Sequence, residues 1–450
     1  MKSANSITAS QLRTQATDPA AGSPASQARA AALPHPKFGH VLAPGYVAPS
    51  LTRLFAAMVA FGFLFYANLN MGAMATRLYE LPLAPNPIVF SVAAVLVAFL
   101  VQPSRRMTGD YFLAAWGFWT CYAVFGFVNM GDAALREVLQ NVLKLWIAVI
   151  GVPWVMLRGL RPASIGKVIQ LFKVCCLVGA VLAFLQFLSP YRFEEIMAAV
   201  HRPSGLWVNP NACGTYLGAA LIVSLDFPLR NRPTELALRA MLGVGMLVTF
   251  SRCAILGILP AIFLHCILRK DYRSATLLAA LLTTLFVGAV MLESRLDDGQ
   301  HRRLQTVTSL LSGDTEAIRE ADNRTEVWRQ AWDAVSRSWF FGVGHENMDH
   351  IADVHGGMGA HNLYLMVWGN SGILAALGLV WFLFVVFRLN AAHRIKAVRT
   401  CSMALICFLF INSLFSHTLL HDMTIGPVLG ILVLLAEGSR QTNAKLRQGS

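Results

Sequence analysis

The run HNLYLMVWGNSGILAALGLVWFLFVVF, residues 361–387, contains no aspartate, glutamate, lysine or arginine. A helix that crosses a bilayer needs about 20 mainly apolar residues, within a range of roughly 17 to 25. The run therefore predicts a membrane-spanning helix. Its first two residues, His361 and Asn362, stand where the longest polar segment between two hydrophobic stretches ends. The role of His361 consequently depends on which side of the membrane this polar segment faces.

The whole chain shares this apolar character. Of its 450 residues, 56% are hydrophobic and only 14% are charged, and its mean hydropathy is +0.54. Charged residues usually make up roughly a quarter of a soluble domain, so the composition predicts an all-α, polytopic membrane protein. The formal net charge of +13 does not indicate a nucleic-acid partner, because the basic residues are scattered through short loops and are not gathered with aromatic residues into one stripe.

About twelve segments are long and apolar enough to be spanning helices. The eight cysteines lie in or at the ends of these segments, which argues against a disulfide framework or a thiolate metal site. The shortest separation between two segments falls at 250–252. The predicted segments are 51–70, 86–103, 111–129, 138–157, 166–188, 212–228, 236–250, 252–268, 274–293, 361–387, 400–417 and 422–437.

Basic residues occupy every second loop between these segments. Because cytoplasmic loops retain Lys and Arg, the alternation predicts that both termini are cytoplasmic and that the long polar segment is periplasmic. The basic residues concerned are Arg105, Arg106, Arg158, Arg161, Lys167, Arg230, Arg232, Arg239, Arg269, Lys270, Arg273, Arg388, Arg394, Lys396 and Arg399. The predicted divisions are a disordered cytoplasmic tail (1–50), spanning helices one to nine (51–293), a periplasmic loop with amphipathic helices before the tenth (294–360), spanning helices ten to twelve (361–437) and a cytoplasmic tail (438–450).

The predicted periplasmic loop carries seven arginines and no lysine. Arginine presents a planar fork that matches phosphate oxygens, whereas lysine is a flexible point charge. The alternative is that each arginine lies on a solvated helix face beside an acidic residue. In NRTEVWRQAWDAVSRSWF, residues 323–340, Val327, Trp328, Ala331 and Val335 recur at helical spacing, which predicts a helix lying along the membrane surface.

Further polar residues reach the same predicted face. HRPSGLWVNPNACG, residues 201–214, places Arg202 before a cluster of Gly, Asn and Pro, and TFSRCA, residues 249–254, places Ser251 and Arg252 at a break between apolar runs. A single arginine at the end of a span is often an anchor that extends its charged group to the interface. Several arginines and a histidine at one face instead indicate a functional site, because charges at a membrane boundary are costly.

His361 also has two interpretations. It can be an interfacial imidazole bonded to backbone, or it can transfer protons, since the ordinary histidine pKa of about 6.5 suits both an acid and a base. A zinc site is a competing possibility in HENMDH, residues 345–350, but Asp349 stands where the helical zinc motif needs its second histidine. The predicted outer loops contain no DxD pair, and the sequence has no Walker or dinucleotide-binding motif. We therefore predict neither a metal nor a cofactor.

Taken together, these motifs resemble the O-antigen ligase and polymerase superfamily of bacterial envelope glycosyltransferases. The resemblance rests on Arg202 with SGLWVNPNACG, SRCAILG, Arg295-Leu296 directly after a span, NRTEVWRQA, GVGHENM and AHNLYLMVWGNSG, and it covers roughly residues 200–390. The order and spacing of the motifs make it specific. Two positions depart from the family's pattern: Cys253 stands where Gly commonly follows Ser-Arg, and Asn370 stands where an acidic or apolar residue often precedes Gly.

The resemblance implies transfer of a glycan from undecaprenyl diphosphate to an acceptor such as lipid A-core, at the periplasmic face of the inner membrane, without metal and with inversion of the anomeric centre. It implies that Arg202 and Arg295 stabilise the departing diphosphate electrostatically, and that His361 activates or orients the acceptor hydroxyl. The predicted substrate-binding residues are Arg252, Arg324, Asn209, Asn211, Ser251 and Asn362. Asn362 can instead cap the helix that follows it.

Two other functions remain open at this stage. A polymerase of the same superfamily would join repeat units while both remain lipid-linked, and the sequence does not separate it from a ligase. A secondary transporter or flippase would have internal repeats and charged residues within its spans. Lys144 and Lys173 lie within apolar segments and favour that function, but the two halves of the chain show no convincing duplication.

Overall fold

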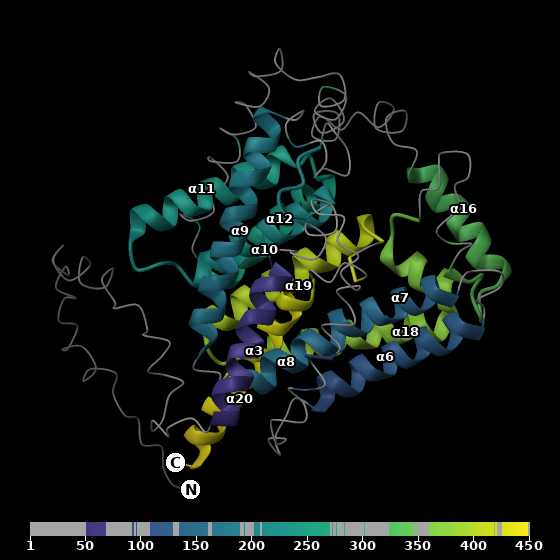
Figure 1. The fold of residues 1–450 in the computed structure, drawn as a ribbon, viewed down its shortest axis with the longest axis horizontal. Coiled ribbons are helices and arrows are strands. Elements are labelled where there is room, and N and C mark those ends of the chain that lie inside the picture. The colour runs from purple at the N-terminus through teal and green to yellow at the C-terminus, as the bar shows by residue number, and fades with distance from the viewer. Residues whose placement is uncertain are drawn as a thin grey trace, which may run out of the picture.

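The structure is a computed structural model that describes residues 51–68, 109–128, 135–160, 164–189, 202–207, 209–270, 324–345, 360–417 and 425–448, with a few single positions. Every regular element in these ranges is a helix, which confirms the predicted all-α class (Figure 1). The elements are α3 (Leu51–Asn68), α6 (Gly109–Val128), α7 (Leu135–Trp146), η1 (Ile147–Gly151), α8 (Val152–Gly159), α9 (Ile165–Leu188), α10 (Pro210–Asp226), α11 (Arg232–Val248), α12 (Arg252–Arg269), α16 (Arg324–Arg337), α18 (Leu363–Ala391), α19 (Lys396–Phe415) and α20 (Ile425–Gln448).

Six helices within the described ranges are long and apolar enough to cross a membrane. One of them, Val138–Gly159, runs through α7, η1 and α8. The predicted total of about twelve is not tested, because segments 86–103 and 274–293 fall almost entirely outside the described residues. The break predicted at 250–252 is present between α11 and α12, whereas α20 continues to Gln448, beyond the predicted end of the last span.

Small residues allow three helices of the core to approach closely. A side chain at Gly214 of α10 would overlap Ser251, and side chains at Gly218 and Gly257 would overlap Phe408 and Asn412 of α19. Small residues at helix interfaces permit this close approach in membrane proteins. α10, α12 and α19 therefore form one tightly packed group, while α6 and α18 run side by side in another (Figure 1).

The helix directions place the basic residues at the ends of α12 and α18 and at the start of α19 on one side of the molecule. Arg269 at the end of α12 lies 3.6 Å from the carboxylate of Asp226 at the end of α10, and its carbonyl oxygen accepts a hydrogen bond from Lys396 at the start of α19. At the C-terminal part of α18, Arg388 pairs with Asp110 in the first turn of α6. We call this the basic end of the molecule. The starts of α10 and α12 and the end of α19 lie at the opposite end.

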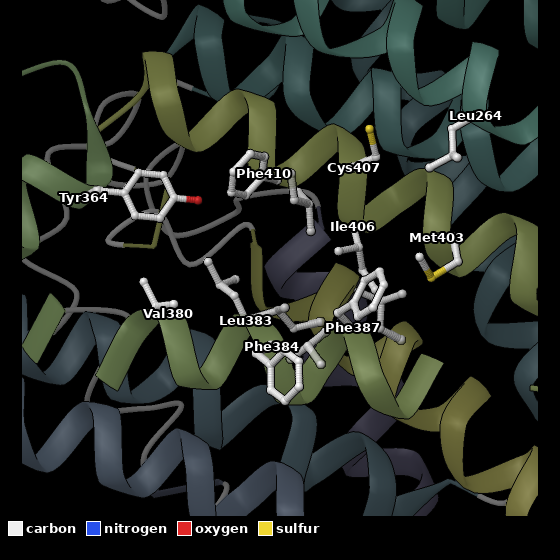
Figure 2. A pocket seen from close by; sticks show the side chains of 14 residues that line it. Leu264, Tyr364, Val380, Leu383, Phe384, Phe387, Met403, Ile406, Cys407 and Phe410 are labelled. Atoms are coloured by element: carbon white, nitrogen blue, oxygen red, sulfur yellow. The ribbon is translucent and has the colours of Figure 1, made fainter. Parts of the chain in front are cut away.

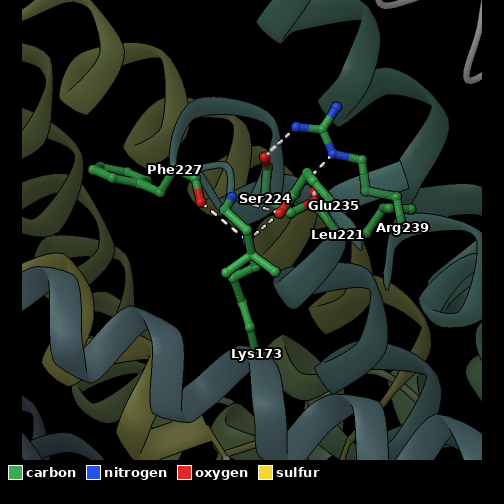
Figure 3. A network of polar contacts seen from close by, with 7 residues as sticks. Lys173, Leu221, Ser224, Phe227, Glu235 and Arg239 are labelled. Atoms are coloured by element: carbon green, nitrogen blue, oxygen red, sulfur yellow. Dashed lines mark hydrogen bonds and ion pairs between the residues drawn. The ribbon is translucent and has the colours of Figure 1, made fainter. Parts of the chain in front are cut away.

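The basic end is fastened by buried ion pairs. Lys173 of α9 lies 2.8 Å from Glu235 and donates to the carbonyl oxygen of Phe227, while Arg239 bonds the other oxygen of Glu235 and the carbonyl of Ser224 (Figure 3). A buried charge is tolerated when it is paired and hydrogen-bonded. Lys173 therefore has a structural explanation as the group that ties α9 to the connection between α10 and α11.

The amphipathic helix predicted over 323–340 is present as α16, and its apolar face packs against other parts of the protein. Val327, Ala331 and Val335 are at most 2% exposed and belong to a cluster that includes Met348 and Met366. The apolar stripe consequently packs against α18, and the position of the helix along the membrane surface stays a prediction. Hydrophobic periodicity identifies a buried face, but it does not say whether protein or lipid covers that face.

Candidate active site

The segment before α10 is a fixed turn that presents Arg202. The side chain of Gln186 accepts hydrogen bonds from the backbone amides of Ser204 and Gly205, and donates to the carbonyl of Gly205. Gly205 has a φ of +56°, and a Cβ there would overlap the carbonyl of Gly179. Gly205 of the SGLW sequence is therefore required for the turn itself, since only glycine combines this conformation with so close an approach.

The start of α10 carries two of the predicted substrate-binding residues. The side-chain oxygen of Asn209 accepts from the amide of Asn211 and caps the helix, with Pro210 in the first turn. Arg202 donates through Nη2 to the side-chain oxygen of Asn211 at 3.1 Å. The arginine and the helix start are thus held together.

The turn between α11 and α12 brings Ser251 to the same place. Phe250 adopts a φ of +50°, and the hydroxyl of Thr249 accepts a hydrogen bond from the amide of Ser251. The hydroxyl of Ser251 lies 3.3 Å from the side-chain oxygen of Asn211 and 3.1 Å from the sulfur of Cys253. We call Arg202, Asn211 and Ser251 the helix-end cluster. Arg252, the first residue of α12, directly follows Ser251 and is partly buried.

His361 precedes the start of α18 in a constrained backbone conformation. Its φ is +48°, which is uncommon for a residue with a side chain and costs of order 1–3 kcal/mol unless the surroundings impose it. The next residue, Asn362, accepts hydrogen bonds from the amides of Tyr364 and Leu365. The capping role that the sequence allowed for Asn362 is therefore observed. His361 is partly buried, and its ring lies against that of His417, with centroids 5.1 Å apart.

The C-terminal part of α19 links His361 to the helix-end cluster. Asn412 accepts a hydrogen bond from Thr215, which lies one turn after Asn211 on α10. The neighbouring Ser413 donates to the hydroxyl of Tyr364 on α18 at 2.9 Å. The starts of α10, α12 and α18 therefore meet around one end of α19. Helix starts carry partial positive charge and unsatisfied N–H groups, which suit an anion.

An apolar groove extends from this end along α18 and α19. Its volume is about 380 Å³, and its remaining walls come from α12 and α20. Figure 2 shows Tyr364 at one end of the groove and Met403 and Phe387 toward the other. Tyr364 lines the groove and also accepts the hydrogen bond from Ser413, so the groove borders the polar contacts at the start of α18.

A second histidine, His345 of the GVGHENM motif, occupies a different site. It is 2% exposed, and its Nδ1 atom lies 3.4 Å from the hydroxyl of Tyr122 on α6. The same hydroxyl accepts from Asn370, while Ser371 donates to the carbonyl of Tyr122. Burial lowers the pKa of His345 to about 4, so the imidazole is neutral near pH 7. We call these four residues the clamp.

The clamp coincides with a break in α18. Ser371 and Gly372 have non-helical backbone angles, and the amides of Val343 and Gly344 donate hydrogen bonds to the carbonyl of Gly369, just before the break. A Cβ at Gly372, whose φ is +73°, would collide with the carbonyl of Phe340. The GNSG sequence therefore packs directly against the backbone of the segment that follows α16. Asn370, one of the departures from the family's pattern, is part of this packing.

Two predicted site residues cannot be placed. Arg295 lies outside the described residues, and Arg324 begins α16 but its side chain is also outside them. The same holds for Asp349 and His350 of the possible metal motif. Within the described part of the chain, no group of three or more His, Cys, Asp or Glu side chains is arranged to hold a metal.

The sequence did not single out four residues that connect the site: Thr215, Asn412, Ser413 and His417. The signal was available, because NS at 412–413 interrupts an apolar run, and polar groups within a span are usually buried against protein. Their partners lie on other helices, however, so the sequence could not identify the contacts.

Comparison with known proteins gives one family match, over part of the chain. No curated protein matches the chain. Residues 237–380 match the family model described as O-Antigen ligase. This range contains Ser251, Arg252, His361 and Asn362, and it ends before α19. The match covers part of the chain and, with the helical fold and these motifs, supports the O-antigen ligase superfamily of membrane proteins.

Proposed function

We propose that the chain is an O-antigen ligase-type glycosyltransferase that moves a glycan from undecaprenyl diphosphate to an acceptor hydroxyl at the periplasmic face of the bacterial inner membrane. The observation that carries the proposal is the convergence of Arg202, Asn211 and Ser251 at helix starts, at the end of the molecule that also holds His361. Lipid A-core is the acceptor class that the family favours.

The helix-end cluster would bind the diphosphate of the donor. A guanidinium group and several helix starts favour an anion, and they would stabilise the negative charge that grows on the leaving diphosphate. Arg202 is held by the amide of Asn211, so its position does not have to be established during the reaction. Arg252, Arg295 and Arg324 remain proposed contributors to the same charge.

The apolar groove would receive the polyprenyl tail of the donor. The groove begins at Tyr364, in the first turn of α18, and runs between α18 and α19 toward the basic end. A lipid diphosphate needs this combination of an anion site at one end and an apolar surface beyond it. The position of Tyr364, which both lines the groove and bonds Ser413 near the helix starts, supports this donor over a water-soluble one.

His361 would act on the acceptor. An imidazole can accept the proton of a hydroxyl as the hydroxyl attacks the anomeric carbon, and a positioned base is worth about 100- to 10,000-fold in rate. A single displacement of this kind inverts the anomeric centre. No metal or nucleotide cofactor is part of the proposal, because the donor carries its own leaving group.

A polymerase remains the alternative within the superfamily, since a second lipid-linked unit would use the same groups as an acceptor. A transporter or flippase is less well supported. The sequence favoured it through Lys173, whose ion pair with Glu235 has a structural explanation at the basic end. Lys144, the second lysine that favoured a transporter, lies in the last turn of α7.

The test is gradient-free transfer by purified protein in detergent, with a polyprenyl diphosphate glycan, lipid A-core as acceptor, and excess EDTA. We expect transfer to lipid A-core and release of polyprenyl diphosphate. Extension of one lipid-linked unit by another would identify a polymerase. No consumption of the donor, together with gradient-dependent movement across vesicles, would identify a transporter, and loss of transfer restored by zinc or magnesium would contradict the metal-free mechanism.

A matched pair of arginine variants tests the anion site. Arg202→Lys keeps the charge and loses the fork, so donor affinity is expected to fall roughly 10- to 100-fold. Arg239→Lys makes the same chemical change at the basic end, beside Glu235, and should leave donor affinity unchanged. Equal effects of the two variants would remove the helix-end cluster from donor binding.

Orientation can be tested separately by labelling. A cysteine at the exposed Asp333 of α16 should react with a membrane-impermeant thiol reagent in intact spheroplasts, and a cysteine at Arg394 of the basic end should not. The reverse labelling would place the proposed site in the cytoplasm.

A further inference from the structure

His417 contacts His361 from a part of the chain that the family match does not include. The two imidazole rings have centroids 5.1 Å apart and planes inclined at 73°, an edge-on arrangement. His417 follows the end of α19, whereas His361 precedes the start of α18. We call these two residues the histidine pair.

The backbone of His361 is already fixed, which leaves its ring as the variable part. The residue is held at a φ of +48° beside the Asn362 cap. A neutral imidazole has one nitrogen that donates and one that accepts, and the group that contacts one nitrogen decides which is which. A base must present its accepting nitrogen to the substrate. Whatever contacts the rest of the ring therefore controls whether His361 can act.

His417 is attached to a well-anchored segment. Asn412 is bonded to α10 through Thr215, and Ser413 is bonded to α18 through Tyr364. The ring of Phe415 lies 6.0 Å from that of Trp328 on α16. The end of α19 is therefore fixed to three other helices, and it carries His417 at a defined position against His361.

We propose that His417 is a positioning residue for His361 in the transfer reaction, which holds the His361 ring in the orientation and tautomer that accept the proton of the acceptor hydroxyl. This inference rests on the proposed function. In the step concerned, the acceptor oxygen bonds the anomeric carbon and its proton passes to His361, while the bond from that carbon to the diphosphate oxygen breaks and its electron pair stays on the diphosphate. A base oriented by a further side chain is a recurrent arrangement in enzymes that activate hydroxyl groups.

The test measures single-turnover transfer and donor binding for His417→Ala, His417→Gln, His361→Ala and the double variant. We expect His417→Ala to transfer about 10- to 100-fold more slowly, which is the size of effect that follows removal of the partner of a metal-bound histidine, with unchanged donor affinity. His417→Gln should recover part of the rate, because its amide both donates and accepts. The double variant should be no slower than His361→Ala, since residues that act as a unit are not additive.

His393→Gln is the matched control, because His393 lies in the connection between α18 and α19 at the basic end, beside Asn390. Its transfer rate should equal that of the wild type. The inference is overturned if His417→Ala transfers normally, if its cost adds fully to that of His361→Ala, or if it lowers donor affinity alone. If the wild type still transfers the glycan in any of these three outcomes, the role of His417 is wrong but the proposed function is retained. If the wild type transfers nothing, both the role of His417 and the proposed function are overturned. Thermal midpoints of all variants identify any loss of folding. If His417→Ala does not fold, the transfer rate of His417→Gln tests the role of His417 in its place.

Discussion

His345 and His361 belong to neighbouring motifs, yet the fold gives them opposite surroundings. His345 is buried in the clamp against Tyr122, with its pKa lowered to about 4. His361 is partly buried, has a left-handed backbone, and lies at the end where α10, α12 and α18 begin. The comparison teaches that two histidines in adjacent motifs can differ in burial and neighbours, which fits a structural role for His345 and the proposed catalytic role for His361.

The largest predicted effect separates the two histidines by function. His361→Ala should slow single-turnover transfer by about 100- to 10,000-fold, because it removes the proposed base, with little change in thermal midpoint. His345→Ala should behave in the opposite way, with a lower midpoint from the emptied site and a transfer rate per folded molecule close to that of the wild type. If both variants lost transfer while remaining equally stable, the two roles would not be distinct.

The next effect is a dependence of stability on pH that belongs to the clamp. The folded protein keeps His345 neutral down to about pH 4, whereas the unfolded chain takes up a proton below its ordinary pKa of about 6.5. Stability should therefore fall as the pH is lowered from about 6.5 to about 4, by about 3 kcal/mol from this group. Thermal midpoints across this range measure it. His345→Gln should flatten the curve relative to the wild type, and an unchanged slope would show that other groups cause it.

The smallest effect concerns the start of α18. Asn362→Ala removes a side-chain cap and should destabilise the protein by about 1 kcal/mol, measured as a lower thermal midpoint. Asn362→Asp keeps an accepting oxygen and should retain most of the stability. A much larger loss of transfer than of stability in Asn362→Ala would indicate that this residue also contacts substrate, which the sequence allowed.

The sequence predicted the helices well and their packing less well. The separate helices α11 and α12 followed from Ser251-Arg252 between apolar runs, and α16 followed from the spacing of Val327, Ala331 and Val335. The burial of that stripe against α18 was not predictable, because hydropathy does not distinguish lipid from protein as a partner. The break in α18 at Gly372 was also missed, since no charged residue interrupts the run.

The candidate site was predicted only in part, because the sequence pattern does not show contacts between residues on different helices. Arg202, Asn211 and Ser251 share a face by the alternation of loops, and the structure brings these three together through hydrogen bonds. His417 was not recognised, because its significance depends on a contact with His361 that no local pattern encodes. Residues that act through a distant partner become visible only when the helices are assembled.

The most direct test of the account asks where the donor binds. A photo-crosslinking phenylalanine analogue can replace Phe415, near His417, or Phe341, in the segment received by the clamp. With a radiolabelled polyprenyl diphosphate glycan, we predict crosslinking at position 415 that excess unlabelled donor abolishes, and no competed crosslinking at position 341. Competed crosslinking at position 341 and none at position 415 would contradict the account, because the donor would then bind at the clamp and not beside the histidine pair.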